Sequence, residues 1–190
     1  SVSGEVEGEW GGLAIEVLSK GGRVYAYIGT RADLIVLDVT DPFAPASISR
    51  VGLEDEVTGL AAAPGHLFCA GRRALWMLDL EDPSAPVQTG QFEIRAHDVA
   101  VSGDSLYVAA TEGLAAVDLS AEPLVLSGPW DIGRGATRLT LVQQEGGPPS
   151  HALLSETSNL LAVGLTGPED PRVVDEFYSI VASRGDALMG

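Results

Sequence analysis

Histidine, serine and carboxylate side chains are the usual agents of catalysis and metal binding, and in this chain they are scattered. The three histidines, His66, His97 and His151, lie far apart in the sequence, which does not match the spacing of metal ligands. Ser105 and Ser155 have no histidine and acid at a diagnostic spacing, and the G-x-S-x-G motif is absent. The sequence therefore predicts no catalytic residue and no metal ligand.

The sequence also lacks the known cofactor-binding motifs. The chain has no Gly-rich phosphate loop of the Walker or dinucleotide type, and no acidic calcium loop of the D-x-D-x-D-G type. Cys69 is the only cysteine, which excludes an intrachain disulfide and a cysteine-based metal cluster. Its neighbours in HLFCAG are apolar, so we expect it to be a buried small hydrophobe. No cofactor is predicted.

The overall charge argues against two classes of partner. The 190 residues carry a formal net charge of −16, and nucleic acids and anionic membrane surfaces attract clustered Lys and Arg instead. No stretch approaches the ~18 apolar residues that span a bilayer. The first residues, SVSGEVEGEW, lack an initiator Met and the pattern of a signal peptide, so we expect a mature, processed or excised piece. We predict no nucleic-acid binding and no membrane insertion.

The most conspicuous acids recur in one register. Asp38, Asp79 and Asp118 follow one another at nearly constant spacing, and Gly164 takes the same place after a somewhat longer interval. Because an aspartate that recurs once per repeat commonly bonds the turn that follows it, we expect a structural role for this series.

These acids lie in a motif that occurs four times, and the later copies are less similar in sequence to the first. The four copies are LIVLDVTDPFAP at Leu34–Pro45, ALWMLDLEDPSAP at Ala74–Pro86, GLAAVDLSAEPLV at Gly113–Val125 and NLLAVGLTGPEDPRVV at Asn159–Val174. A period of roughly 40 residues indicates a repeat architecture.

Each copy belongs to a set of four short strands. Two apolar runs joined by a tight turn precede the motif, and a more polar run follows it, which is typical of antiparallel hairpins and not of helices. The first apolar runs are Leu13–Leu18, Gly59–Ala63, Asp98–Ser102 and Arg138–Val142; the second are Arg23–Gly29, His66–Gly71, Ser105–Ala110 and His151–Ser155. A longer connection over residues 143–150 explains the longer interval before Gly164.

Four-stranded antiparallel units of about 40 residues predict an all-β fold, a β-propeller whose blades surround a central channel. We treat residues 1–190 as one propeller region. Its parts are an outer strand at 2–10, blades at 13–53, 57–93, 97–132 and 136–177, and a partial blade at 178–190. Half-blades at both ends leave unpaired edges. We therefore expect an incomplete ring that another polypeptide or a second copy completes.

The repeated cassette resembles the LVIVD-repeat family of β-propellers. The closest matches are Leu34–Pro45 and the pair Tyr107–Ala110 and Gly113–Leu119, whereas the fourth repeat departs at Gly164 and in its PEDP turn. The resemblance implies a secreted protein at an extracellular, cell-surface or periplasmic location, and it implies no common catalytic set.

Basic residues favour one face of the predicted propeller. Six of the eleven Lys and Arg residues fall in loops that share the channel mouth or at the inner-strand starts beside them: Arg31, Arg72, Arg73, Arg95, Arg134 and Arg138. An arginine-rich rim on an acidic body favours an anionic or glycan ligand. The alternative is that these arginines pair with the acids of the same loops, which are equally abundant.

We therefore expect a non-enzymatic interaction or scaffold module that binds a protein or glycan partner at the channel-mouth face. The alternative is a binder of a small anionic ligand, or an enzyme, that gathers polar side chains at the mouth. The residues suited to that role are His97, Asp98, Thr137 and Arg138.

Overall fold

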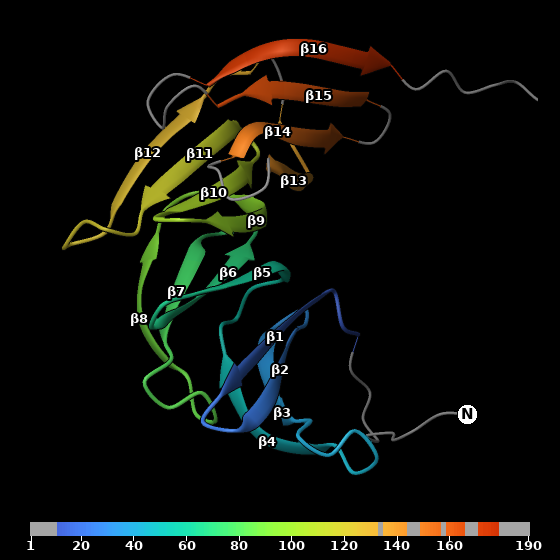
Figure 1. Cartoon of the computed structure of the whole chain (residues 1–190), viewed down its shortest axis with the longest axis vertical. Coiled ribbons are helices and arrows are strands. Elements are labelled where there is room, and N and C mark those ends of the chain that lie inside the picture. Colours follow the sequence, from blue (N-terminus) through green and yellow to red (C-terminus); the bar gives the residue numbers. More distant parts are fainter. Residues whose placement is uncertain (1–10, 133–134, 144–148, 157–158, 166–170, 179–190) are drawn as a thin grey trace, which may run out of the picture.

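The computed structural model describes residues 11–132, 135–143, 149–156, 159–165 and 171–178 (Figure 1). The described residues form sixteen strands and no helix. Blade 1 comprises β1 (Ala14–Lys20), β2 (Arg23–Gly29), β3 (Asp33–Asp38) and β4 (Ala46–Gly52); blade 2 comprises β5 (Val57–Ala63), β6 (His66–Gly71), β7 (Leu75–Asp79) and β8 (Val87–Phe92). Blade 3 comprises β9 (Ala96–Ser102), β10 (Ser105–Ala110), β11 (Gly113–Asp118) and β12 (Val125–Trp130); blade 4 comprises β13 (Arg138–Gln143), β14 (Pro149–Glu156), β15 (Asn159–Gly164) and β16 (Arg172–Tyr178).

Each blade is a four-stranded antiparallel sheet whose strands follow one another in sequence order, which confirms the predicted all-β, propeller-like fold. The turns between first and second strands need residues that tolerate a left-handed backbone. Gly65 and Gly103 supply it, with φ of +79° and +56°.

The predicted second strands of blades 1, 2 and 3 agree with β2, β6 and β10 at both ends. The first strands β5 and β9 begin two residues earlier than predicted, because a bulge lets Val57 and Ala96 pair as well. The predicted strands at 2–10 and 180–189 lie outside the described residues, as does most of the long connection in blade 4.

The four blades stand side by side in an arc, and the described residues form no closed ring (Figure 1). Their first strands, β1, β5, β9 and β13, are neighbours along the arc. A Cβ atom added at Gly59 in β5 would lie 2.8 Å from the Cα atom of Asp98 in β9, so these two strands approach too closely for any larger residue there.

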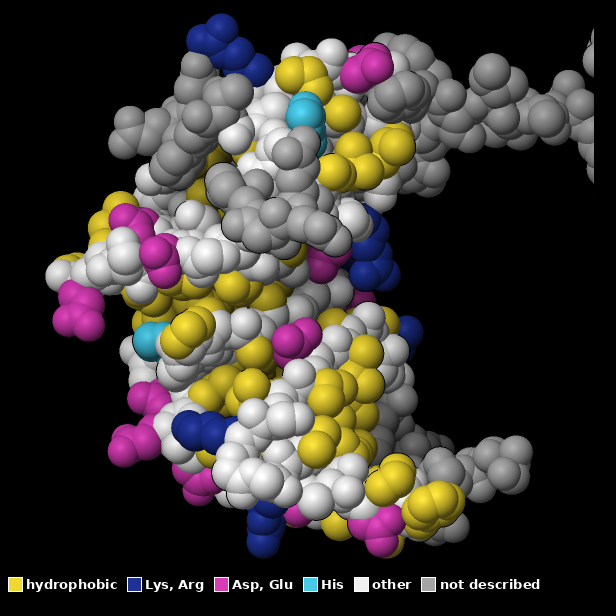
Figure 2. Space-filling view, in the orientation of Figure 1, with side chains coloured by type: hydrophobic (Ala, Val, Ile, Leu, Met, Phe, Trp, Pro, Cys, Tyr) yellow, Lys and Arg dark blue, Asp and Glu magenta, His cyan; other side chains and the backbone are white. Residues whose placement is uncertain are grey.

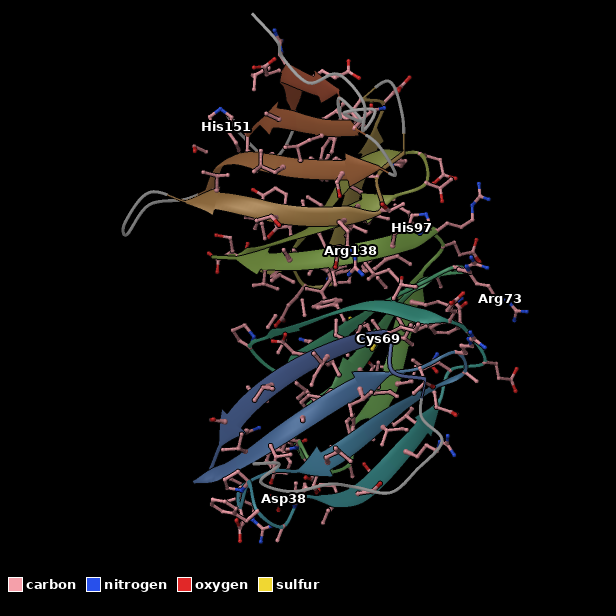
Figure 3. All side chains as sticks on the ribbon, turned by 90° about the vertical axis from the view of Figure 1, so that its right-hand side faces the viewer. Asp38, Cys69, Arg73, His97, Arg138 and His151 are labelled. Carbon is pink, nitrogen blue, oxygen red and sulfur yellow. The ribbon has the colours of Figure 1, made fainter. Side chains whose placement is uncertain are left out.

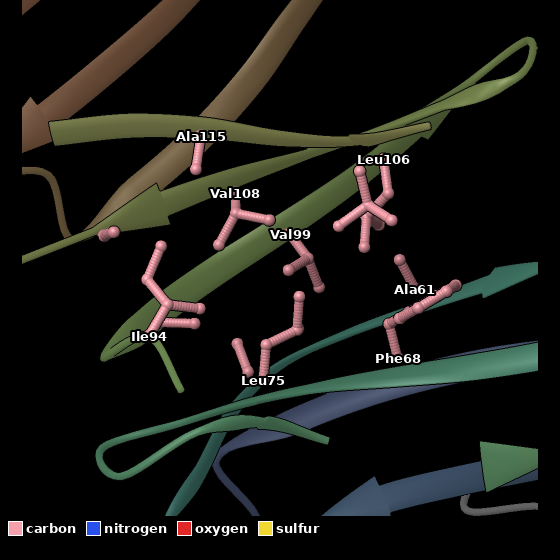
Figure 4. Close-up of a cluster of buried hydrophobic side chains, with 12 residues drawn as sticks. Ala61, Phe68, Leu75, Ile94, Val99, Leu106, Val108 and Ala115 are labelled. Carbon is pink, nitrogen blue, oxygen red and sulfur yellow. The ribbon is translucent and has the colours of Figure 1, made fainter. Parts of the chain in front are cut away.

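The hydrophobic core is divided into layers between blades. One cluster lies between blades 1 and 2, a second between blades 2 and 3, and a third between blades 3 and 4. Figure 4 shows the second, in which Phe68 and Leu75 of blade 2 face Val99, Leu106 and Val108 of blade 3. Because successive side chains of a strand point to opposite faces, each blade contributes one set of residues to each neighbour.

Candidate partner-binding site

A cleft opens between blades 2 and 3 at the face where the channel mouth was predicted. Its volume is about 610 Å³. It is lined by residues of the β6–β7, β8–β9 and β10–β11 connections and of strands β7, β8 and β12: Arg73, Ala74, Trp76, Gln91, Glu93, Ile94, Arg95, Glu112, Leu126, Gly128 and Pro129. Two of the six predicted rim arginines therefore reach one concave surface.

Arg73 is anchored through its backbone N–H group, and its side chain extends into solvent. Its N–H donates to Oδ2 of Asp55 over 2.9 Å, and the indole N–H of Trp76 donates to the same oxygen over 3.1 Å. Asp55 is 5% exposed, so this carboxylate is a buried anchor for the loop. The Arg73 side chain is exposed and forms no ion pair with the described part of the chain.

Two other rim arginines are paired with acids. Arg72 contacts Glu56 at 2.9 Å, and Arg95 contacts Glu112 at 2.8 Å. All four side chains are at least partly exposed, and such pairs contribute roughly 0–1 kcal/mol to stability. For these two arginines the structure favours the pairing alternative.

His97 lies beside these charges at the start of β9. Its Nε2 atom is 2.9 Å from the hydroxyl of Thr111. Partial burial lowers the pKa of His97, the positive charges of Arg72 and Arg95 lower it further, and Glu112 raises it. The imidazole is therefore predominantly neutral near pH 7.

Asp98, Thr137 and Arg138 lie at the junction of blades 3 and 4 and do not line the cleft. Asp98 accepts hydrogen bonds from the N–H groups of Val99 and Leu139, each 3.0 Å long. Burial raises the pKa of Asp98, while those hydrogen bonds and the charge of Arg138 lower it. The hydroxyl of Thr137 donates to the carbonyl of Ser155 over 2.9 Å. In the view of Figure 3, Arg73 lies at the edge of the molecule, further out than His97 and Arg138.

The remaining predicted arginines do not contribute to this site. Arg31 is exposed in the β2–β3 turn of blade 1 and does not line the cleft. Arg134 lies outside the described residues. Asp55 was not predicted as a site residue, because nothing in the LEDEV stretch distinguishes a buried acid from its exposed neighbours.

The recurring acids have the structural role that was predicted for them. Oδ1 of Asp38 accepts a hydrogen bond from the N–H of Thr40 over 2.9 Å, and Oδ1 of Asp118 accepts one from the N–H of Ser120 over 2.8 Å. Asp79 bonds the N–H of Glu81 in the same way. Each carboxylate thus holds the turn that leads to the outer strand.

The described ranges include Cys69, all three histidines and most of the acidic residues. Cys69 is fully buried between blades 1 and 2, as predicted, and burial raises the pKa of its thiol. Within those ranges, three or more His, Cys, Asp or Glu side chains are nowhere grouped so as to hold a metal ion. The same residues include no helix of the length and apolarity needed to cross a membrane.

Comparison with known families adds one finding. The model of the LVIVD repeat matches residues 11–52 and 95–123. Two segments of the chain are thus similar to the LVIVD repeat. The two matched segments cover blade 1 and the first three strands of blade 3, and they include the tight hairpins and the Asp38 and Asp118 turns described above. No curated protein matches the chain.

Proposed function

We propose that this LVIVD-repeat chain is a non-enzymatic interaction module that binds a partner protein at the cleft between blades 2 and 3. The observation that carries the proposal is the combination of a concave surface with Arg73, an exposed arginine whose loop is anchored but whose guanidinium has no ion pair among the described residues. An exposed guanidinium on an anchored loop is suited to a bidentate contact with a carboxylate.

The cleft also has an apolar part, which favours a peptide segment over a free anion. Ala74, Ile94, Leu126 and Pro129 line it together with the charged residues. A partner that places an acidic side chain beside an apolar one would complement both parts. Glycan binding usually relies on exposed aromatic rings, and Trp76, the aromatic residue among those that line the cleft, is partly buried against the core between blades 1 and 2.

Three of the four residues of the enzymatic alternative make hydrogen bonds that maintain the fold. His97 bonds Thr111, Asp98 bonds two backbone N–H groups and Thr137 bonds a carbonyl. None of the four lines the cleft. The interaction module is therefore the function that this geometry favours.

Selection from a phage-displayed library of random peptides on the full chain tests the proposal. We expect enriched peptides to pair an acidic residue with an apolar one. Arg73→Glu should weaken their binding by at least tenfold in calorimetry, whereas the same change at Arg31, a predicted rim arginine that is also exposed but lies outside the cleft, should not. Enrichment of peptides without acids, equal loss in both variants, or binding of a glycan array in place of peptides would overturn it.

A further inference from the structure

Every blade has two apolar faces with different partners. We call the face toward the preceding blade the leading face and the face toward the following blade the trailing face. At each of the three junctions, the trailing face of one blade packs on the leading face of the next. The strand pairing puts the four blades in register, so equivalent positions can be compared directly.

The leading face of blade 1 is exposed where its equivalents are buried. Leu60, Val99 and Leu139 take the same place in the first strands of blades 2, 3 and 4, and they are 8%, 6% and 8% exposed. Ile15 takes that place in blade 1 and is 66% exposed. Val17, two residues along the same face, is 55% exposed.

The rest of this face is apolar as well. It forms a separate cluster of Ala26, Ile28, Ile35, Leu37 and Val39. The equivalent residues of blade 2 are Leu67, Cys69, Trp76, Leu78 and Leu80, and all of them pack in the core shared with blade 1. Figure 2 shows hydrophobic side chains gathered on the surface over blade 1. Ala26, Ile35 and Leu37 are 5%, 3% and 7% exposed, so the exposed part of this face lies along the first strand, β1, and no described strand packs on it.

The trailing face of blade 4 shows the complementary exposure. Leu34, Leu75 and Leu114 take one place in the third strands of blades 1, 2 and 3, and each is 0% exposed. Leu160 takes that place in blade 4 and is 37% exposed. Val142 on the first strand of the blade is 38% exposed.

We propose that the occupant of each face is a second copy of this chain. The trailing face of blade 4 in one copy packs on the leading face of blade 1 in the other, head to tail. These two faces are the halves of the junction that the chain already forms three times, and both are apolar at the positions compared. Two copies arranged in this way cover all four faces, each with the kind of junction that the chain already forms between its own blades.

The internal junctions also predict which residues meet between copies. Gly59 and Asp98 hold equivalent positions on adjacent first strands, and a Cβ atom at Gly59 would lie 2.8 Å from the Cα atom of Asp98. The equivalent positions in blades 1 and 4 are Ala14 and Arg138. Ala14 of one copy should therefore lie beside Arg138 of the other.

Light scattering of the full chain, from micromolar to hundreds of micromolar, is the first test. We expect twice the mass of one chain. Ile15→Arg and Leu160→Arg should each reduce the mass to one chain, whereas Val87→Arg, on a side chain 62% exposed on the outer strand β8, should leave it unchanged. Arg73→Glu should also leave it unchanged, which separates this proposal from the cleft.

Mixing the two disruptive variants tests the head-to-tail arrangement. Each retains one intact face, so an equimolar mixture should regain a two-chain species. A monomeric wild type, a mass that exceeds two chains, or a dimer that survives Leu160→Arg would overturn the proposal. Thermal unfolding of each variant shows whether it has folded.

Disulfide formation supplies a test that does not depend on disrupting the fold. The double variant Ala14→Cys/Arg138→Cys should form disulfide-linked dimers on mild oxidation, whereas each single variant should not. The native Cys69 is buried and should not interfere. An absence of cross-linking in the double variant would contradict the predicted junction.

Discussion

The carboxylate of Asp98 in β9 accepts a hydrogen bond from the backbone N–H of Leu139 in β13, over 3.0 Å. The two residues are 41 positions apart and belong to different blades. The other oxygen of the same carboxylate accepts from the N–H of Val99 in its own strand, so one side chain joins blade 3 to blade 4.

Asp98→Asn should weaken that junction. An amide has only one acceptor oxygen, so one of the two N–H groups would face an NH₂ group in place of an acceptor. We expect a loss of about 1–3 kcal/mol in the free energy of unfolding, measured by urea denaturation. Asp104→Asn, in the exposed β9–β10 turn, is the matched control and should change little. Equal stability of the two variants would show that the contact contributes nothing.

Gly59→Ala should destabilise the junction of blades 2 and 3. The added methyl group would lie 2.8 Å from both the Cα atom and Oδ1 of Asp98, and the backbone atom cannot move without shifting β9. Overpacking of this kind costs about 1–3 kcal/mol. Gly11→Ala, where no atom lies within 4 Å of the new methyl group, provides the comparison in thermal unfolding. If Gly59→Ala unfolds at the same midpoint temperature as the wild type, strands β5 and β9 can move apart at no cost in stability.

The turn aspartates should make the fold sensitive to acid. Side-chain hydrogen bonds, from Thr40 to Asp38, from Ser84 to Asp82 and from Ser120 to Asp118, are the main cause of the lowered pKa of each acid. Carboxyl groups with a lowered pKa stabilise the fold above their unfolded pKa of about 3.9. That contribution is lost as the pH falls through the lower, folded value.

A pair of serine substitutions isolates this effect. Ser84→Ala/Ser120→Ala removes two hydroxyl donors to the turn aspartates and should flatten the loss of stability between about pH 4 and pH 2. Ser47→Ala on an exposed strand is the control. Glu16 and Asp98 have the opposite effect, because burial raises their pKa values. Their contribution to stability is present at low pH and is lost as the pH rises through the folded pKa values. An unchanged acid slope in the double variant would refute the assignment.

The pKa of His97 should respond to the charges of the arginine and glutamate side chains near it. Burial and the charges of Arg72 and Arg95 lower its pKa, whereas Glu112 raises it. We expect a pKa below about 6.5 for His97 in an NMR titration. Arg72→Gln should raise it, and Glu112→Gln should lower it further. If the pKa of His97 shifts in the opposite direction in these variants, Arg72 and Glu112 do not lie beside it as described.

Local pattern was sufficient to predict the strands. The short apolar runs and the tight turns between them predicted the second-strand boundaries of three blades to the residue, because hairpin register depends on neighbours close in sequence. The rim was predicted less completely. Whether Arg95 binds a ligand or Glu112 depends on how two loops meet, which no local pattern contains.

The sequence by itself determined the repeat, the four-stranded unit and the roles of residues that act within one unit, since those depend on contacts between residues near in the chain. Only the tertiary structure decided which acids bond residues distant in the chain, as Asp55 and Asp98 show, and which apolar positions remain uncovered, as Ile15 and Leu160 show. Ile15 and Leu160 are apolar, like their equivalents in the other blades. Their burial differs because it depends on the neighbouring blade, which is distant in the chain, and not on the strand to which they belong.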